Sequence, residues 1–141
     1  MDPKSLQADF KRGSANLSKR NFDAAIDDLS KAIELNPTYD NAYLKRGAAY
    51  AEKKEYDKAL ADLTHFIDSK PAVPDGYRQR ARVYDLMNNK ELADKDRRTL
   101  TDLGVKYYIR PRIQRTRHSN SSIPPSTRSY SKIKFTIFRS V

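Results

Sequence analysis

The sequence predicts an all-α protein of stacked helical hairpins, and two patterns support this prediction. Apolar residues recur every three or four positions over most of residues 6–103, which is the spacing of a helix with one apolar face. In addition, five positions reappear 34 residues later as residues of a similar kind: Gly13, Phe22, Ala25, Leu29 and Pro37 correspond to Gly47, Tyr56, Ala59, Leu63 and Pro71. A fixed period of this length is typical of proteins in which neighbouring repeats stack. We therefore predict one domain over residues 6–104, with repeats at about 6–39, 40–73 and 74–104.

The first repeat begins with four residues that share one helical face: Leu6, Phe10, Gly13 and Leu17. Arg20 and Asn21 interrupt this pattern, and Asn favours both turns and the start of a helix. A second apolar stripe follows and consists of Phe22, Ala25, Leu29, Ala32 and Ile33. Because the residue before a proline disfavours the α conformation, we expect the second helix to end at Asn36 and Pro37.

The second repeat follows the same scheme with a clearer pattern. Its first helix is lined by Tyr43, Gly47 and Tyr50, and the turn falls at residues 53–55. The apolar face of its second helix comprises Tyr56, Ala59, Leu60, Leu63, Phe66 and Ile67. Pro71 ends this helix, as Pro37 does in the first repeat.

The third repeat, over residues 74–103, departs from the pattern in its second helix. Pro74 suits the first helical turn, where its missing N–H loses no hydrogen bond. Lys90 and Arg97 stand where the earlier repeats have an aromatic residue and a leucine. We expect this helix to end at Gly104 and to have an apolar face of Leu92, Ala93, Leu100 and Leu103. Its other face is very polar, as a terminal repeat requires.

These features resemble the tetratricopeptide repeat family, whose units are helix–turn–helix hairpins of 34 residues. The family has small residues at the eighth and twentieth positions of each repeat, and a proline near the end. The matching residues are Gly13, Gly47 and Ala81, then Ala25, Ala59 and Ala93, and finally Pro37 and Pro71. The resemblance covers residues 6–103. It implies a short right-handed superhelix and no enzyme activity. It also implies that the protein binds other proteins as a scaffold or adaptor, in the manner of a co-chaperone.

The resemblance also implies a binding groove, because family ligands contact the first helices of successive repeats. The residues at these positions are Phe10, Ser14, Leu17, Asn41, Leu44, Ala48, Arg78 and Arg82, together with Gln7, Ser18, Ala51, Glu52, Asp75, Asp85 and Leu86. Arg78 and Arg82 lie one helical turn apart, so a partner with an apolar anchor and an acidic group would fit. Alternatively, Phe10, Leu17 and Leu44 simply pack against a neighbouring helix.

Some family members bind the acidic C-terminal tail of Hsp70- or Hsp90-type chaperones with a clamp of Lys, Asn and Arg side chains. The corresponding positions in this sequence are Phe10, Ser14, Lys45, Asp75 and Gln79, and none of them matches. We therefore predict no such carboxylate clamp.

Charged residues also follow the period. Arg12, Arg46 and Arg80 recur at intervals of 34, and so do Asp28, Asp62 and Asp96. One interpretation is a stripe of arginines that binds anions. The interpretation we favour is one bidentate ion pair inside each hairpin, with the Arg on the first helix and the Asp on the second.

The composition argues against a catalytic or metal site. The chain has no Cys, which excludes thiolate ligands and thiol nucleophiles, and its two histidines, His65 and His118, belong to no recognisable motif. We predict no cofactor. The first ten residues lack the pattern of a secretory signal, and no run of 18 apolar residues occurs. We therefore expect a cytoplasmic protein.

Residues 105–141 differ abruptly from the rest of the chain. They contain nine Lys and Arg and no acidic residue, whereas residues 1–104 contain 19 basic and 18 acidic residues. We expect this tail to be largely disordered. Three interpretations stay open: a basic arm that binds nucleic acid or an anionic membrane, a passive extension, or a segment from a shifted reading frame or altered splice end.

The function predicted from the sequence is that of a protein-interaction module that holds a peptide or helix of its partner. An alternative is an adaptor whose tail supplies affinity for nucleic acid or membrane. A further alternative is a fragment of a longer repeat array, which would self-associate through exposed surfaces at Leu100 and Tyr84.

Overall fold

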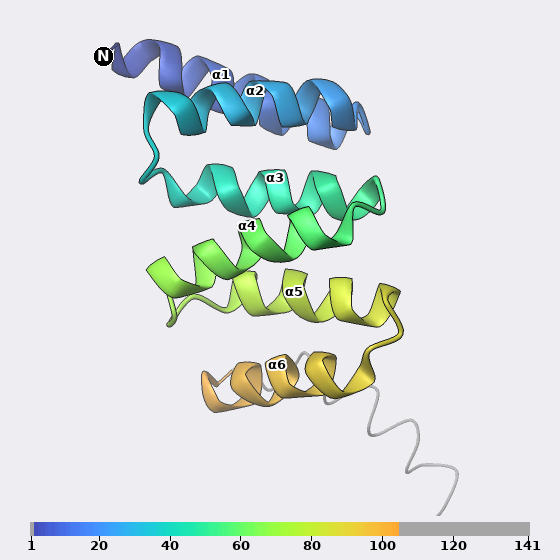
Figure 1. The fold of residues 1–141 in the computed structure, drawn as a ribbon. Coiled ribbons are helices and arrows are strands. Elements are labelled where there is room, and N and C mark those ends of the chain that lie inside the picture. The colour runs from blue at the N-terminus through green and yellow to red at the C-terminus, as the bar shows by residue number, and fades with distance from the viewer. Residues whose placement is uncertain (1, 105–141) are drawn as a thin grey trace, which may run out of the picture. The chain divides into compact units, whose positions relative to one another are not determined.

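The computed structural model describes residues 2–104, which form six α-helices in three hairpins (Figure 1). The helices are α1 (Pro3–Ser18), α2 (Phe22–Leu35), α3 (Asp40–Glu52), α4 (Tyr56–Ser69), α5 (Pro74–Leu86) and α6 (Lys90–Asp102). This part of the chain contains no strand, so the prediction of an all-α fold is confirmed. The tail predicted from residue 105 onwards lies outside the described residues.

The hairpins stack in chain order, as Figure 1 shows. Within each hairpin the two helices pack against each other, and the stack continues through contacts of α2 with α3 and of α4 with α5. The first helices of the hairpins also touch, since α1 contacts α3 and α3 contacts α5. These three helices therefore share one side of the domain.

The hydrophobic core runs through the stack instead of closing within one hairpin. Leu29 is fully buried in a cluster that includes Ala42 and Ala49 of the next hairpin. Leu63 is fully buried in a second cluster that includes Val83 of the third hairpin. Each hairpin thus buries apolar surface against its neighbour, which is how a repeat array obtains its stability.

Close approach of the two helices in a hairpin requires a residue without bulk at the crossing point. A Cβ atom on Gly47 would lie 2.9 Å from Cγ of Leu63, and one on Gly13 would lie 2.8 Å from Cγ of Leu29. In the third hairpin both residues of this contact differ. Ala81 stands at the position of the glycine, and Arg97 stands at the position of the leucine. The guanidinium of Arg97 pairs with Asp85 and Asp94.

Each hairpin turn contains one residue in the left-handed conformation, and these residues are also spaced by 34. They are Arg20, Lys54 and Asn88, with φ angles of 64°, 63° and 63°. The residue after each of them donates its amide N–H to a carbonyl five residues earlier, at 2.8–2.9 Å, which closes a Schellman motif. The turn was predicted at Arg20 and Asn21, but Arg20 takes the left-handed position, and Asn21 makes no side-chain capping bond.

The first helix begins earlier than residue 6, where the repeat pattern placed it. Pro3 occupies its first turn, and the Asp2 carboxylate accepts a hydrogen bond from the amide of Lys4 at 3.0 Å. Apolar periodicity does not detect such a start, because the signal is an Asp at the cap followed by proline and not a repeating apolar residue.

Two predictions for the third hairpin are wrong. Leu92 and Leu103 were placed on the apolar face of α6, but they are 36% and 38% exposed, since no further described helix packs on that side. Leu100 is fully buried within its own hairpin, so it offers no surface for self-association. Gly104 follows the helix with a φ of 89°, which suits the predicted helix end.

None of the six helices is long and apolar enough to cross a membrane.

Candidate protein-binding face

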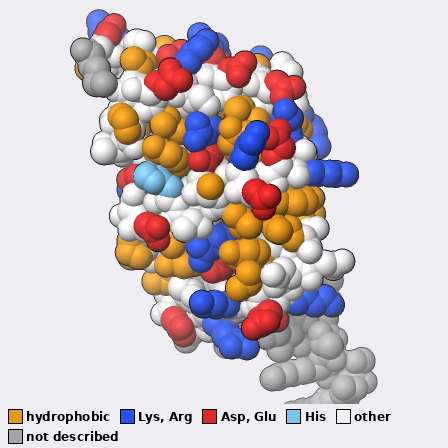
Figure 2. Space-filling view, in the orientation of Figure 1, with side chains coloured by type: hydrophobic (Ala, Val, Ile, Leu, Met, Phe, Trp, Pro, Cys, Tyr) orange, Lys and Arg blue, Asp and Glu red, His pale blue; other side chains and the backbone are white. Residues whose placement is uncertain are grey.

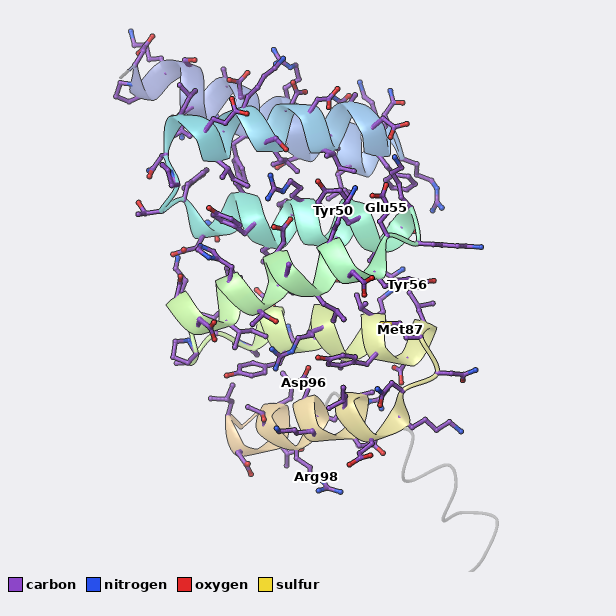
Figure 3. All side chains as sticks on the ribbon, viewed as in Figure 1. Tyr50, Glu55, Tyr56, Met87, Asp96 and Arg98 are labelled. Atoms are coloured by element: carbon purple, nitrogen blue, oxygen red, sulfur yellow. The ribbon has the colours of Figure 1, made fainter. Side chains whose placement is uncertain are left out.

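The periodic arginines and aspartates form ion pairs inside the hairpins, as the spacing predicted. Arg46 donates from Nε and Nη2 to the two carboxylate oxygens of Asp62, at 2.8 Å each. Arg80 binds Asp96 in the same way at 2.8 and 2.7 Å, and Asp96 lies between α5 and α6 in Figure 3. These hydrogen bonds raise the pKa of both guanidinium groups. Arg46 and Arg80 do not form an anion-binding stripe, because Asp62 and Asp96 each bind two guanidinium nitrogens and only 18% of each arginine side chain is exposed.

The same arginines also join successive hairpins. Arg46 donates to the hydroxyl of Ser30 at 3.0 Å, and Arg80 donates to that of Thr64 at 3.2 Å, so each arginine reaches the preceding second helix. Arg12 has no preceding hairpin among the described residues. Its Nη2 binds Asp9 at 2.8 Å in addition to Asp28 at 2.5 Å, and the other carboxylate oxygen of Asp28 accepts from Nδ2 of Asn16 at 3.0 Å. The bidentate geometry predicted for this pair is therefore wrong in the first hairpin.

A hollow of about 280 Å³ opens between α1, α3 and α5. It is lined by Leu17, Ser18, Arg20, Phe22, Ala48, Glu52, Gln79 and Arg82. Five of the predicted groove residues therefore come together at one place: Leu17, Ser18, Ala48, Glu52 and Arg82. All three helices of the shared side contribute to the lining.

The other predicted groove residues lie elsewhere. Phe10 is half-buried, and its ring meets that of Tyr39 edge-on with 4.9 Å between centroids. Leu44 packs against the core cluster around Leu63. Phe10 and Leu44 thus pack against neighbouring parts of the chain, as the alternative interpretation predicted.

The polar members of the predicted groove are also dispersed. Arg78 binds Asp75 at 2.8 Å, and neither residue lines the hollow. Asn41 is exposed and does not line it either. The hydroxyl of Ser14 is buried without a hydrogen-bond partner among the described residues. Arg78 and Arg82 therefore do not act as one cationic pair.

The charge at the hollow is centred on Glu52. Its carboxylate lies 2.5 Å from Nη2 of Arg82 and 3.8 Å from Nη2 of Arg20. The Arg20 guanidinium also lies over the ring of Phe22, 5.5 Å from its centroid. Two cationic groups thus share one anionic group beside the apolar side chains of Leu17 and Phe22.

The predicted groove set did not include Arg20, Phe22 or Gln79. Arg20 belongs to the turn and Phe22 to the start of α2, and both line the hollow together with Ala48 and Glu52 of α3. The sequence contains a pattern that could have indicated them: Arg20 at the turn position of the repeat, two residues before the aromatic Phe22.

A second hollow, of about 370 Å³, lies where the turns after α3 and α5 approach each other. Glu55, Tyr56 and Met87 line it and lie along one edge of the stack in Figure 3. Glu55 binds Lys58 at 2.6 Å and Lys53 at 3.2 Å, and these bonds lower the pKa of its carboxyl. Two of the charged residues that line this hollow, Glu55 and Lys58, are thus paired with each other.

The surface around these features has no single sign of charge. Figure 2 shows Lys and Arg side chains interspersed with Asp and Glu over the visible face. No group of three His, Cys, Asp or Glu residues suited to a metal ion occurs in residues 2–104.

The positions of the chaperone clamp hold residues with other contacts. Phe10 meets Tyr39, and Asp75 pairs with Arg78. The absence of a carboxylate clamp stays a prediction.

Comparisons with known proteins agree with the geometry. Family models described as "TPR repeat" and "Tetratricopeptide repeat" match residues 13–54 and 40–73. A search of curated proteins found no match.

Among solved structures, a crystal structure of MamA is similar with a TM-score of 0.68 and 32% identity, over 76% of this chain and 63% of that chain. This chain thus spans less than two thirds of the length of that MamA chain. The Arabidopsis OM64 TPR domain has a TM-score of 0.66 and 21% identity, over 70% of this chain and 82% of that chain.

A third similar structure is the first TPR of Spaghetti (RPAP3) bound to the HSP90 peptide SRMEEVD. Its TM-score is 0.68 and its identity 20%, over 73% of this chain and 82% of that chain. The 34-residue hairpins, their small residues at the helix crossings and the matching family models agree, and the fold is that of a protein–protein interaction module. This chain belongs to the tetratricopeptide repeat family.

Proposed function

We propose that this protein is a non-enzymatic scaffold that holds a peptide or a helix of a partner protein against α1, α3 and α5. The observation that carries this proposal is the hollow between these helices, which receives side chains from all three hairpins. A ligand that follows the stack would cross it.

The size and lining of the hollow support a side chain as its occupant. Its volume of about 280 Å³ is just below the range of roughly 300–1,000 Å³ that is usual for small-molecule sites. Leu17, Phe22 and Ala48 supply apolar contacts, while Gln79 supplies a side-chain amide for hydrogen bonding. An apolar anchor with polar neighbours is a common mode of peptide recognition.

The similar structure of Spaghetti (RPAP3), which holds an HSP90 peptide, supports peptide binding as a mode for this fold. The residues at the clamp positions differ in this chain. We therefore propose a partner other than a protein that ends in Glu-Glu-Val-Asp, and we propose the cytoplasm as the place of action.

The proposal is tested by selecting peptides from a phage-displayed library on the full-length protein. A selected peptide is then titrated into isotope-labelled protein, and amide chemical shifts are followed. We expect the largest shifts at residues that line the hollow, such as Leu17, Ala48 and Gln79. Shifts confined to α2, α4 and α6, or the absence of any selected peptide, would contradict the proposal.

The alternatives that involve nucleic acid or an anionic membrane depend on residues 105–141, which lie outside the described part of the chain. Nothing in residues 2–104 favours them. Binding to RNA or to anionic vesicles that weakens with salt would support them.

A further inference from the structure

We propose that the hollow recognises an acidic side chain within a partner peptide, next to an apolar one, and that Glu52 is an internal competitor for the same arginines. This inference rests on the function proposed above and adds to it the chemistry of the partner. It concerns a carboxylate in the middle of a peptide and not a free C-terminus.

The first argument is the ratio of charges. Arg20 and Arg82 both approach Glu52, at 3.8 and 2.5 Å, and no other carboxylate lines the hollow. A guanidinium has five N–H donors, and one carboxylate has two oxygen atoms. The two arginines therefore retain donors for a second carboxylate, and the local charge is positive while only Glu52 is present.

The second argument is exposure. The side chains of Arg20 and Arg82 are 77% and 51% exposed, whereas that of Glu52 is 23% exposed. The arginine side chains are thus more accessible to an incoming ligand than the carboxylate of Glu52 is. An exposed ion pair of this kind is weak, so a ligand carboxylate displaces or joins it without a large penalty.

The third argument is the neighbourhood. Arg20 lies over the ring of Phe22, and Leu17 and Ala48 line the same hollow. An acidic side chain at the arginines would therefore place the adjacent residue of the peptide over apolar surface. The chemistry of the occupant is then an Asp or Glu beside an aliphatic or aromatic residue.

The test uses the full-length protein and a random peptide library fused at its C-terminus to the phage coat, so that no free carboxyl terminus is offered. We expect the selected peptides to be enriched in Asp and Glu. One enriched peptide is then synthesised with an amidated C-terminus, together with a version in which Asp and Glu become Asn and Gln.

Three variants separate the contributions. We expect the double variant Arg20→Ala/Arg82→Ala to lose at least about five-fold in affinity for the acidic peptide, and Glu52→Gln to gain about three-fold, since each change alters exposed ion pairs. Arg98→Ala is the control, because Arg98 is exposed and points away from the stack in Figure 3. Circular dichroism checks that each variant is folded.

The outcomes are distinct for the two proposals. Peptides that shift amides around the hollow without acidic enrichment, or that bind equally after the amide substitutions, would overturn this inference and leave the proposed function intact. A loss of affinity in Glu52→Gln would show that Glu52 positions the arginines instead of competing for them, and would overturn the competition. A failure to select any peptide would overturn both proposals.

Discussion

Arg46 and Asp62 bind each other through two parallel hydrogen bonds across the second hairpin, and their side chains are 18% and 9% exposed. Removal of Asp62 leaves a poorly solvated guanidinium without its partner. We expect Asp62→Ala to lower the free energy of unfolding by about 3 kcal/mol, as is usual for breaking a buried pair. Urea denaturation measures this change.

The control for this prediction is Asp68→Ala. Asp68 is exposed on the same helix, so its removal should change stability by less than about 0.5 kcal/mol. Equal effects of the two substitutions would show that the Arg46–Asp62 pair does not stabilise the hairpin.

Asp28 makes the stability depend on pH. The hydrogen bond from Arg12 is the main cause that lowers the pKa of its carboxyl from the ordinary value of 3.8. A lowered pKa in the folded state means that the unfolded chain takes up the proton first. The stabilisation is therefore complete above about pH 4 and is lost as the pH falls through the folded-state pKa.

We expect Asp28→Asn to reduce the slope of the unfolding free energy against pH below about pH 4. Urea denaturation between pH 2.5 and 6 measures this slope for the wild-type protein and the variant. If both proteins show the same slope, the Arg12–Asp28 bond does not contribute in the way described.

Ala59 is fully buried at the crossing of α3 and α4, and its carbonyl oxygen would lie 3.3 Å from a Cβ on Gly47. A larger side chain at residue 59 would force the helices apart. We expect Ala59→Leu to destabilise the protein by about 1–3 kcal/mol through overpacking. Ala61→Leu is the matched control on the exposed side of α4, and a thermal midpoint common to both variants would contradict this packing.

Lys54 takes the left-handed conformation, with a φ of 63°, in the turn between α3 and α4. A residue with a Cβ atom is strained there by roughly 1–2 kcal/mol. Glycine avoids this strain, but it loses more backbone entropy on folding than lysine does, which offsets part of the gain. We therefore expect Lys54→Gly to stabilise the protein by about 0.5–1 kcal/mol. Lys53→Gly should destabilise it, because Lys53 has a helical conformation and pairs with Asp23 and Glu55. Chemical denaturation of both variants gives the two signs.

The repeat period predicted much of the fold, because a spacing of 34 fixes both the helix face and the position along the stack. Arg46 and Asp62 were predicted to pair on that basis alone. The period did not predict the start of α1, since Asp2 and Pro3 precede the apolar pattern. It also failed for Leu92 and Leu103, because amphipathicity marks an apolar face but does not say whether another element covers it.

The binding face was less predictable for the same reason. A position in the repeat tells which side of the stack a residue faces, and this placed Leu17, Ala48 and Arg82 together. It does not tell how far a side chain is covered, as Phe10 against Tyr39 shows. Arg20 was missed because its role depends on the backbone of the turn, which carries the side chain towards Glu52.

The claim that α1, α3 and α5 form the binding face is tested most directly by a matched pair of charge insertions. Ala48 lines the hollow on α3, and Ala61 is exposed on α4. The affinity of a library-selected peptide for the full-length protein is measured with Ala48→Glu and with Ala61→Glu by isothermal titration calorimetry. We expect Ala48→Glu to weaken binding about ten-fold or more, and Ala61→Glu to change it less than about two-fold. Equal affinities for the two variants would contradict a partner site on this face.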